Sequence, residues 1–135
     1  MSANLDTVHD LYAAFGRGDL ATVLGLMDEQ IEWNEPETVP YGSHVGPQAV
    51  AEKVLAQVIA DMPDFSATPE QFVDGGGDTI MTVGTYRGTS AKTGRKLDTP
   101  FAHVFQFRSG KIASFRTISD THLWRHALGI ADARI

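Results

Sequence analysis

A carboxyl group stands in the chain where strand alternation calls for an apolar residue. Ile31, Trp33 and Glu35 alternate over residues 30–36, so a strand here turns Glu35 toward the face that seeks a core. Burial of a carboxylate is costly unless it is paired or protonated, and a raised pKa makes it a usable proton acceptor or donor. Glu35 is therefore a candidate for proton transfer. The alternative is that the strand ends at Pro36 and that the carboxylate lies in water.

A histidine stands in a similar apolar row. Alternation over residues 95–107 places His103 on one face with Phe101 and Phe105. Such surroundings disfavour the charged imidazole, so His103 could act as a neutral hydrogen-bond donor or acceptor. It could equally be a core histidine whose nitrogens are satisfied by structural partners.

A second acid follows the last predicted strand. Alternation predicts one shared face for Ile112, Ser114, Arg116, Ile118 and Asp120. Asp120 is thus a third catalytic candidate. It also directly precedes a helical segment, where aspartate is favoured as N-cap, and the two roles can coexist.

The residues around these groups supply the expected substrate contacts. Tyr12 lies on the apolar side of the first predicted helix, where it belongs either to the core or to a pocket wall. Tyr41 lies in a Pro- and Gly-rich loop that could cover a pocket entrance. The predicted substrate-binding residues are Tyr12, Phe15, Trp33, Tyr41, Phe101, Phe105, Arg116 and Ile118.

Composition excludes several functional classes. With 135 residues, 42% of them hydrophobic, we expect one compact domain over residues 1–135. A net charge of −6 with scattered basic residues argues against a nucleic-acid partner. No apolar run approaches the roughly 18 residues of a membrane span, and the N-terminus lacks the pattern of a signal peptide, so we expect a cytoplasmic protein without a membrane partner.

Neither a metal nor a cofactor is expected. The chain has no cysteine, which removes thiolate ligands and thiol nucleophiles. His122 and His126 are spaced i, i+4, but no acid accompanies them as in a metalloprotease motif. A Gly-rich nucleotide fingerprint between a strand and a helix is also lacking.

Hydrophobic periodicity and turn residues predict an α+β fold. Helical spacing over residues 5–15 predicts a first helix, Asp19 can cap a second short one, and Pro47 can begin a third. Strands are predicted at 31–35, 65–74, 79–87, 95–107 and 111–119, followed by a closing helix that ends at Gly129. A curved, mostly antiparallel sheet would wrap the helices and leave a pocket for a small molecule.

These elements carry a family resemblance over nearly the whole chain. Residues 11–20 and 31–36 resemble the opening of SnoaL-like proteins in the nuclear transport factor two-like superfamily. Segments 94–97, 101–105, 110–112 and 115–120 match the family's later strands in order. The resemblance implies a cone-shaped barrel, in which a strongly curved, mixed, mostly antiparallel sheet wraps three N-terminal helices and a short C-terminal helix follows. It also implies a deep apolar pocket and a homodimer.

The resemblance allows more than one reaction. Glu35 falls where ketosteroid isomerases carry their base, and His103 falls near their second, protonated acid, but their oxyanion tyrosine aligns closer to Leu11 than to Tyr12. In polyketide cyclases an acid–base aspartate resembles Asp120 and a histidine resembles His103, which is the better fit. Epoxide hydrolysis is disfavoured, because the residues that it needs on an earlier strand have no counterpart.

The leading hypothesis is a cofactor-independent isomerase or cyclase that moves a proton next to the carbonyl of a small apolar compound. Glu35 or Asp120 would abstract the proton, and His103, helped by Tyr12, would hydrogen-bond the enolate oxygen. The rival hypothesis is a small-molecule-binding or dimeric assembly module that has a pocket but no chemistry.

Overall fold

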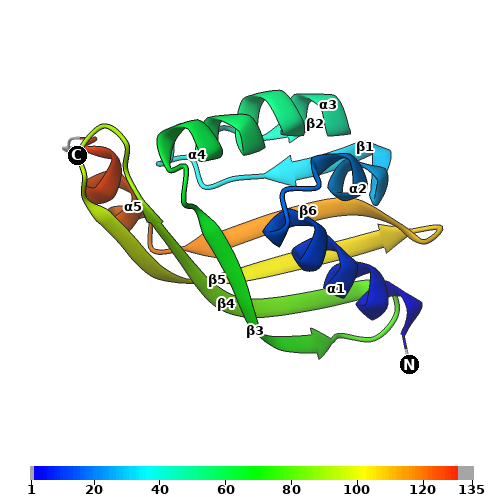
Figure 1. Cartoon of the computed structure of the whole chain (residues 1–135). Coiled ribbons are helices and arrows are strands. Elements are labelled where there is room, and N and C mark those ends of the chain that lie inside the picture. The colour runs from blue at the N-terminus through cyan, green and yellow to red at the C-terminus, as the bar shows by residue number, and fades with distance from the viewer. Residues whose placement is uncertain (1, 131–135) are drawn as a thin grey trace.

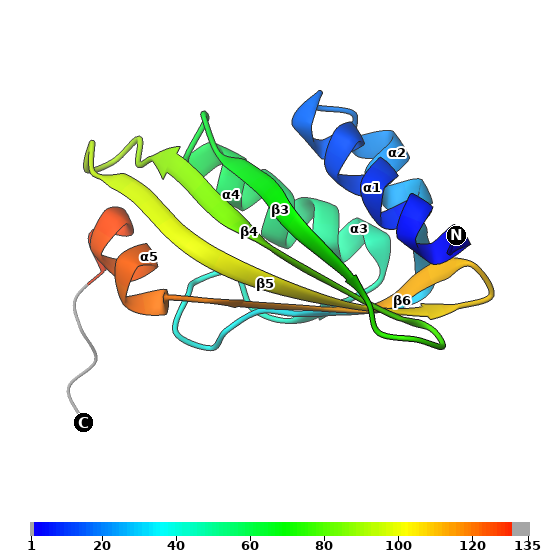
Figure 2. The ribbon, with the colours of Figure 1, turned by 90° about the horizontal axis from the view of Figure 1, so that it is seen from below.

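A single curved sheet carries the helices on its concave face (Figure 1). The structure is a computed structural model that describes residues 2–130. The strands are β1 (Met27–Asn34), β2 (His44–Val45), β3 (Ser66–Asp74), β4 (Thr79–Thr89), β5 (Lys96–Arg108) and β6 (Lys111–Ser119). The helices are α1 (Ala3–Gly16), α2 (Leu20–Gly25), α3 (Pro47–Val50), the π-helical segment η1 (Ala51–Leu55), α4 (Ala56–Asp61) and α5 (Thr121–Leu128). Figure 2 shows α1, α3 and α4 on one side of the sheet and α5 at one end of it.

The predicted helix boundaries are confirmed by local capping. The Asp19 side chain accepts a hydrogen bond from the Thr22 amide and begins α2, and Pro47 is the first residue of α3. Gly129 ends α5 in the left-handed conformation, with φ 73°. These residues fix where each helix meets the sheet.

The third helix contains a π-helical segment in its middle. α3, η1 and α4 follow one another without a break from Pro47 to Asp61. The wider turn of η1 brings the neighbouring residues Val54 and Leu55 into the core together. Such segments often occur at functional sites, and this one lies directly over the concave face of the sheet.

The sheet order is β2-β1-β6-β5-β4-β3. Strands β3 to β6 form the predicted antiparallel meander, whereas β1 runs parallel to β6. The two-residue strand β2 was not predicted, because its pairing with β1 leaves no periodic signal. The parallel pair brings the end of β1, which Glu35 follows, beside β6, the last strand along the chain.

The fold is therefore the expected α+β class. Its mixed, mostly antiparallel sheet curves like a cone around the N-terminal helices without closing, and a short C-terminal helix follows. Among residues 2–130, no helix has the length and apolar character needed to cross a membrane.

Candidate functional site

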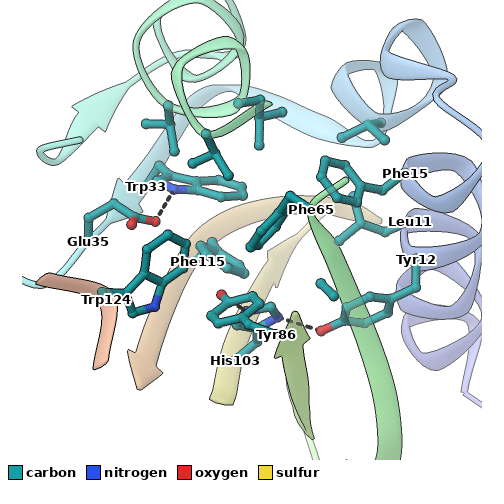
Figure 3. A pocket seen from close by; sticks show the side chains of 15 residues that line it. Leu11, Tyr12, Phe15, Trp33, Glu35, Phe65, Tyr86, His103, Phe115 and Trp124 are labelled. Carbon is teal, nitrogen blue, oxygen red and sulfur yellow. Dashed lines mark hydrogen bonds between the residues drawn. The ribbon is translucent and has the colours of Figure 1, made fainter. Parts of the chain in front are cut away.

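A cavity lies between the concave face of the sheet and the helices (Figure 3). Its volume is about 80 Å³, and its walls are mostly aromatic and aliphatic. One water needs on the order of 10–15 Å³ by this kind of measure, so the cavity holds several waters or one small ligand. The lining groups with polar atoms are Tyr12, Trp33, Glu35, Tyr86, His103 and Trp124.

Glu35 reaches this cavity from the end of β1, on the same side as Trp33. The Trp33 indole N–H donates to Glu35 Oε2 at 2.8 Å. Burial raises the pKa of the Glu35 carboxyl from 4.5 to about 7, and the indole hydrogen bond offsets part of that rise. Glu35 also lines a shallow surface groove with Thr117 and Ser119. Glu35 thus borders both the cavity and this groove.

His103 lies on the opposite wall and is uncharged. Burial lowers its pKa to about 3, and the Phe101 ring stacks on the imidazole at 4.0 Å between ring centroids. Both ring nitrogens are hydrogen-bonded to tyrosine hydroxyls. Nδ1 lies 2.6 Å from the Tyr12 hydroxyl, and Nε2 lies 2.5 Å from the Tyr86 hydroxyl. Figure 3 shows these three side chains together.

Tyr86 and Thr117 belong to this network and were not predicted. The Tyr86 hydroxyl lies 2.7 Å from Thr117 Oγ1. Its pKa is raised well above the ordinary value by burial, with a further rise from the charge of Glu35. Alternation along β4 would have found Tyr86, because Ile80, Thr82 and Tyr86 share the buried face.

Aromatic rings form the rest of the wall. Trp33 on β1 stacks on Phe115 of β6 with ring centroids 3.8 Å apart, as the parallel register of the two strands requires. Phe65 and Trp124 pack against each other with ring centroids 5.7 Å apart. Phe15, a predicted substrate-binding residue, lines the cavity from α1. These flat surfaces favour a flat apolar ligand.

Three of the predicted substrate-binding residues are buried but do not line the cavity. Two of them, Phe101 and Phe105, are buried on the concave face. Tyr41 is buried too, and its hydroxyl donates to Asp61 at 2.9 Å. Tyr41 touches Trp124 edge-on at 5.9 Å, so it supports the wall rather than forming it.

Arg116 and Ile118 share a face, as predicted, but a β-bulge turns that face away from Ile112 and from the cavity. Phe107 pairs with Ile112, but Gln106 pairs with Ser114, so Ala113 is an extra residue in β6. The bulge turns Thr117 inward in place of its neighbours. Arg116 and Ile118 consequently lie on the exposed side, where Ile118 is 52% exposed.

Asp120 takes the N-cap position that was the alternative reading of the sequence. Its Oδ1 accepts hydrogen bonds from the amides of His122 and Leu123 at 3.1 and 3.3 Å. The residue is exposed and does not line the cavity. The structure thus brings Glu35 and His103 to one cavity and leaves Asp120 outside it.

The titratable groups of the cavity do not form a metal site. Within residues 2–130, no group of three or more His, Cys, Asp or Glu side chains is arranged to hold an ion. What the cavity offers is one carboxyl group of near-neutral pKa opposite a set of uncharged donors and acceptors.

The fold and the sequence define the family. A SnoaL-like domain matches residues 8–115, so the chain belongs to the SnoaL-like family. No significant match to a curated protein was found.

Solved structures with the same fold agree with this assignment. An NTF2-like protein of unknown function from Burkholderia pseudomallei K96243 is 30% identical, with a TM-score of 0.87 over 95% of this chain and 98% of that one. TerC, co-crystallised with polyporic acid, is 26% identical, with a TM-score of 0.84 over 95% and 99%. IdmH from Streptomyces antibioticus, a proposed polyketide cyclase, is 28% identical, with a TM-score of 0.77 over 94% and 99%.

Proposed function

We propose that the chain is a cofactor-independent enzyme that moves a proton on the carbon next to a carbonyl group, in a small and largely apolar compound. The result would be an isomerisation or an aldol-type cyclisation. The observation that carries this proposal is that Glu35, with a pKa of about 7, shares one apolar cavity with an uncharged tyrosine–histidine network. The proposed activity of IdmH and the co-crystallisation of TerC with polyporic acid support a ligand of this kind.

Glu35 is the base in this proposal. The carboxylate takes the proton from the carbon, and the electrons of the broken C–H bond move through the carbon–carbon bond to the carbonyl oxygen. An enolate and a neutral Glu35 result. In an isomerisation Glu35 returns the proton to a different carbon. In a cyclisation the enolate carbon attacks a second carbonyl group, and the new alkoxide takes the proton.

The cavity fits both halves of this reaction. A base works best when its pKa lies near the operating pH, and burial has moved Glu35 close to neutrality. Hydroxyl groups held in a dry site stabilise a developing oxyanion far better than water does, because they need no reorganisation. Asp120 is not assigned the role, since its carboxylate caps α5 and is exposed.

Hydrogen–deuterium exchange tests the proposal without knowledge of the natural substrate. Small aryl ketones and 1,3-diketones would be incubated with the full chain in D₂O, and loss of the acidic C–H signal would be followed by NMR. We expect exchange above background, and about 10²–10⁴-fold less in Glu35→Gln. Glu32→Gln is the matched control, because Glu32 lies on the exposed side of β1.

Two results would contradict the proposal. Equal exchange in Glu35→Gln and the unmodified chain would exclude Glu35 as the base. Loss of exchange only in Asp120→Asn would identify Asp120 as the base instead. Saturable binding of these ketones with no exchange at all would favour the rival binding module. The specific observation behind that rival is that Glu35 and His103 both already have structural hydrogen-bond partners.

A further inference from the structure

Four polar groups form one continuous hydrogen-bonded chain along the cavity wall. It runs from Thr117 Oγ1 on β6 to the Tyr86 hydroxyl on β4, through His103 on β5, to the Tyr12 hydroxyl on α1. The hydroxyl and nitrogen distances are 2.7, 2.5 and 2.6 Å in that order. Tyr86, His103 and Thr117 are buried, so water does not interrupt the chain.

The neutral state of His103 makes this chain directional. A neutral imidazole has one N–H and one unprotonated nitrogen, so it donates on one side and accepts on the other. If Nδ1 carries the proton, it donates to Tyr12, while Tyr86 donates to Nε2 and Thr117 donates to Tyr86. If Nε2 carries the proton, every one of these hydrogen bonds is reversed.

The two directions leave a free O–H at opposite ends. With the proton on Nδ1, the free O–H belongs to Tyr12, which lines the cavity. With the proton on Nε2, the free O–H belongs to Thr117, which does not. Burial raises the pKa of the Tyr12 hydroxyl, and the nearby Thr82 hydroxyl opposes that rise. The fully buried Thr82 hydroxyl meets no partner in good hydrogen-bond geometry within residues 2–130, so hydrogen-bonding capacity remains at the Tyr12 end.

We propose that Tyr86 and Thr117 are positioning residues, and that a ligand presenting an unprotonated oxygen to Tyr12 fixes His103 as the Nδ1–H tautomer. The ligand class is an enolate or phenolate oxygen, which needs a donor and offers no proton of its own. This inference builds on the proposed function, because the enolate formed there is such a ligand. Each donor in the aligned chain polarises the next, which strengthens the terminal Tyr12 hydrogen bond.

The tautomer can be read directly in the Glu35→Gln variant. Removing the carboxylate removes a negative charge that would repel a phenolate, so 4-nitrophenolate serves as the probe. In ¹⁵N-labelled full chain, the His103 signals are assigned among the five histidines by their loss in His103→Gln. We expect a protonated Nδ1 and an unprotonated Nε2 in the complex. A protonated Nε2, or no saturable binding of the probe, would overturn the proposal.

Affinity tests the two positioning residues. In the Glu35→Gln background, Thr117→Val and Tyr86→Phe each remove one hydroxyl of the chain, and we expect about 2–10-fold weaker binding of 4-nitrophenolate. Thr117→Ser keeps the hydroxyl and should retain the affinity. Thr99→Val is the control, because Thr99 is fully buried and its side chain, within residues 2–130, hydrogen-bonds only to the neighbouring Pro100 carbonyl. Unchanged affinity in both Thr117→Val and Tyr86→Phe would contradict the positioning role.

Tyr12→Phe tests whether Tyr12 binds the ligand oxygen alone or as the end of the hydrogen-bonded chain. Loss of a hydrogen bond to a charged oxygen should cost about 10–100-fold in probe affinity. If Tyr12→Phe has this effect while Thr117→Val and Tyr86→Phe both have none, Tyr12 acts alone and the inference fails. Since Glu35→Gln lacks the base, these results do not depend on turnover. Absence of ketone exchange in the unmodified chain would instead defeat only the proposed function.

Discussion

A single indole N–H restrains how basic Glu35 becomes. Burial favours the neutral carboxylic acid, whereas the Trp33 hydrogen bond favours the carboxylate. The pKa of about 7 is the balance of these two effects. Trp33 therefore contributes to the chemistry as well as to the cavity wall.

Trp33→Phe should raise the pKa of Glu35 above about 7, because it removes the indole hydrogen bond that opposes the effect of burial. The pH midpoint of the ketone exchange rate should move upward with it, since the rate requires the carboxylate. Both can be measured by ¹³C NMR titration of the carboxyl group and by a pH–rate profile. Trp124→Phe is the matched control, because Trp124 lines the same cavity and is not the partner of Glu35. A midpoint that moves downward in Trp33→Phe would contradict this account.

Glu35 also links the stability of the fold to pH. The folded pKa of about 7 lies above the ordinary 4.5. Between those values the folded chain keeps a proton that the unfolded chain releases, so stability falls as pH rises, by up to about 3 kcal/mol at pH above 7.

Glu35→Gln should remove this penalty. The variant should be more stable than the unmodified chain at pH 8, by up to about 3 kcal/mol, and similar to it at pH 4. Urea denaturation at the two pH values measures the difference. Glu32→Gln provides the comparison on the exposed side of β1. A Glu35→Gln variant less stable at pH 8 would show that the carboxylate is stabilised rather than strained by its surroundings.

At the level of the elements, the bend of the sheet depends on Gly84 in β4. A Cβ atom there would lie 2.2 Å from the Thr68 carbonyl oxygen and 2.6 Å from Phe101 Cζ. The register between β3 and β4 shifts close by, between Pro69 and Gln71. The strands can therefore approach here only because the residue has no side chain.

Gly84→Ala should be strongly destabilising, by about 1–3 kcal/mol or more, because backbone as well as side chain must move. It should also disturb His103, since the displaced Phe101 stacks on that ring. Urea denaturation and the His103 NMR signals report the two effects. Gly16→Ala is the control, because nothing lies within 4 Å of its Cβ position and alanine is the better helix former. A stability of Gly84→Ala equal to that of Gly16→Ala would refute the close packing.

The elements also explain which site residues could be predicted. Alternation placed Trp33 and His103 on the buried faces of β1 and β5, because both strands keep their pleat at those positions. β1 ends one residue before Glu35, and the Trp33 indole hydrogen bond keeps that carboxyl group on the Trp33 side. In β6 the same rule failed beyond Ala113, since a bulge at small residues leaves no mark in the hydrophobic pattern. Asp120 could not be decided from sequence, because a helix cap and a pocket acid call for the same residue type.

For the whole molecule, the outer face of the sheet carries an apolar row across three strands. Val83 on β4 pairs with Ala102 on β5, which pairs with Ile118 on β6. Val83 is 39% exposed and Ile118 is 52% exposed. We propose that this row lies at the centre of a homodimer interface, since apolar rows of this kind are characteristic of contact surfaces.

Val83→Asp and Ile118→Glu should each shift the chain toward the monomer, because a charge would be buried at the centre of the contact. Size-exclusion chromatography with light scattering measures the mass at several concentrations. Ile59→Glu is the control, as Ile59 is similarly exposed but lies on α4, on the opposite side of the sheet. A monomeric unmodified chain would rule out the dimer.

The sheet order also has a consequence for how the protein is made. β1 has only the two-residue β2 and the late strand β6 as neighbours. During synthesis β1 can therefore pair only with the two-residue β2 until β6 has been made. Phe115 of β6 forms part of the same cavity wall as Glu35, so the surroundings that raise the pKa of this carboxyl group are complete only after β6 has docked.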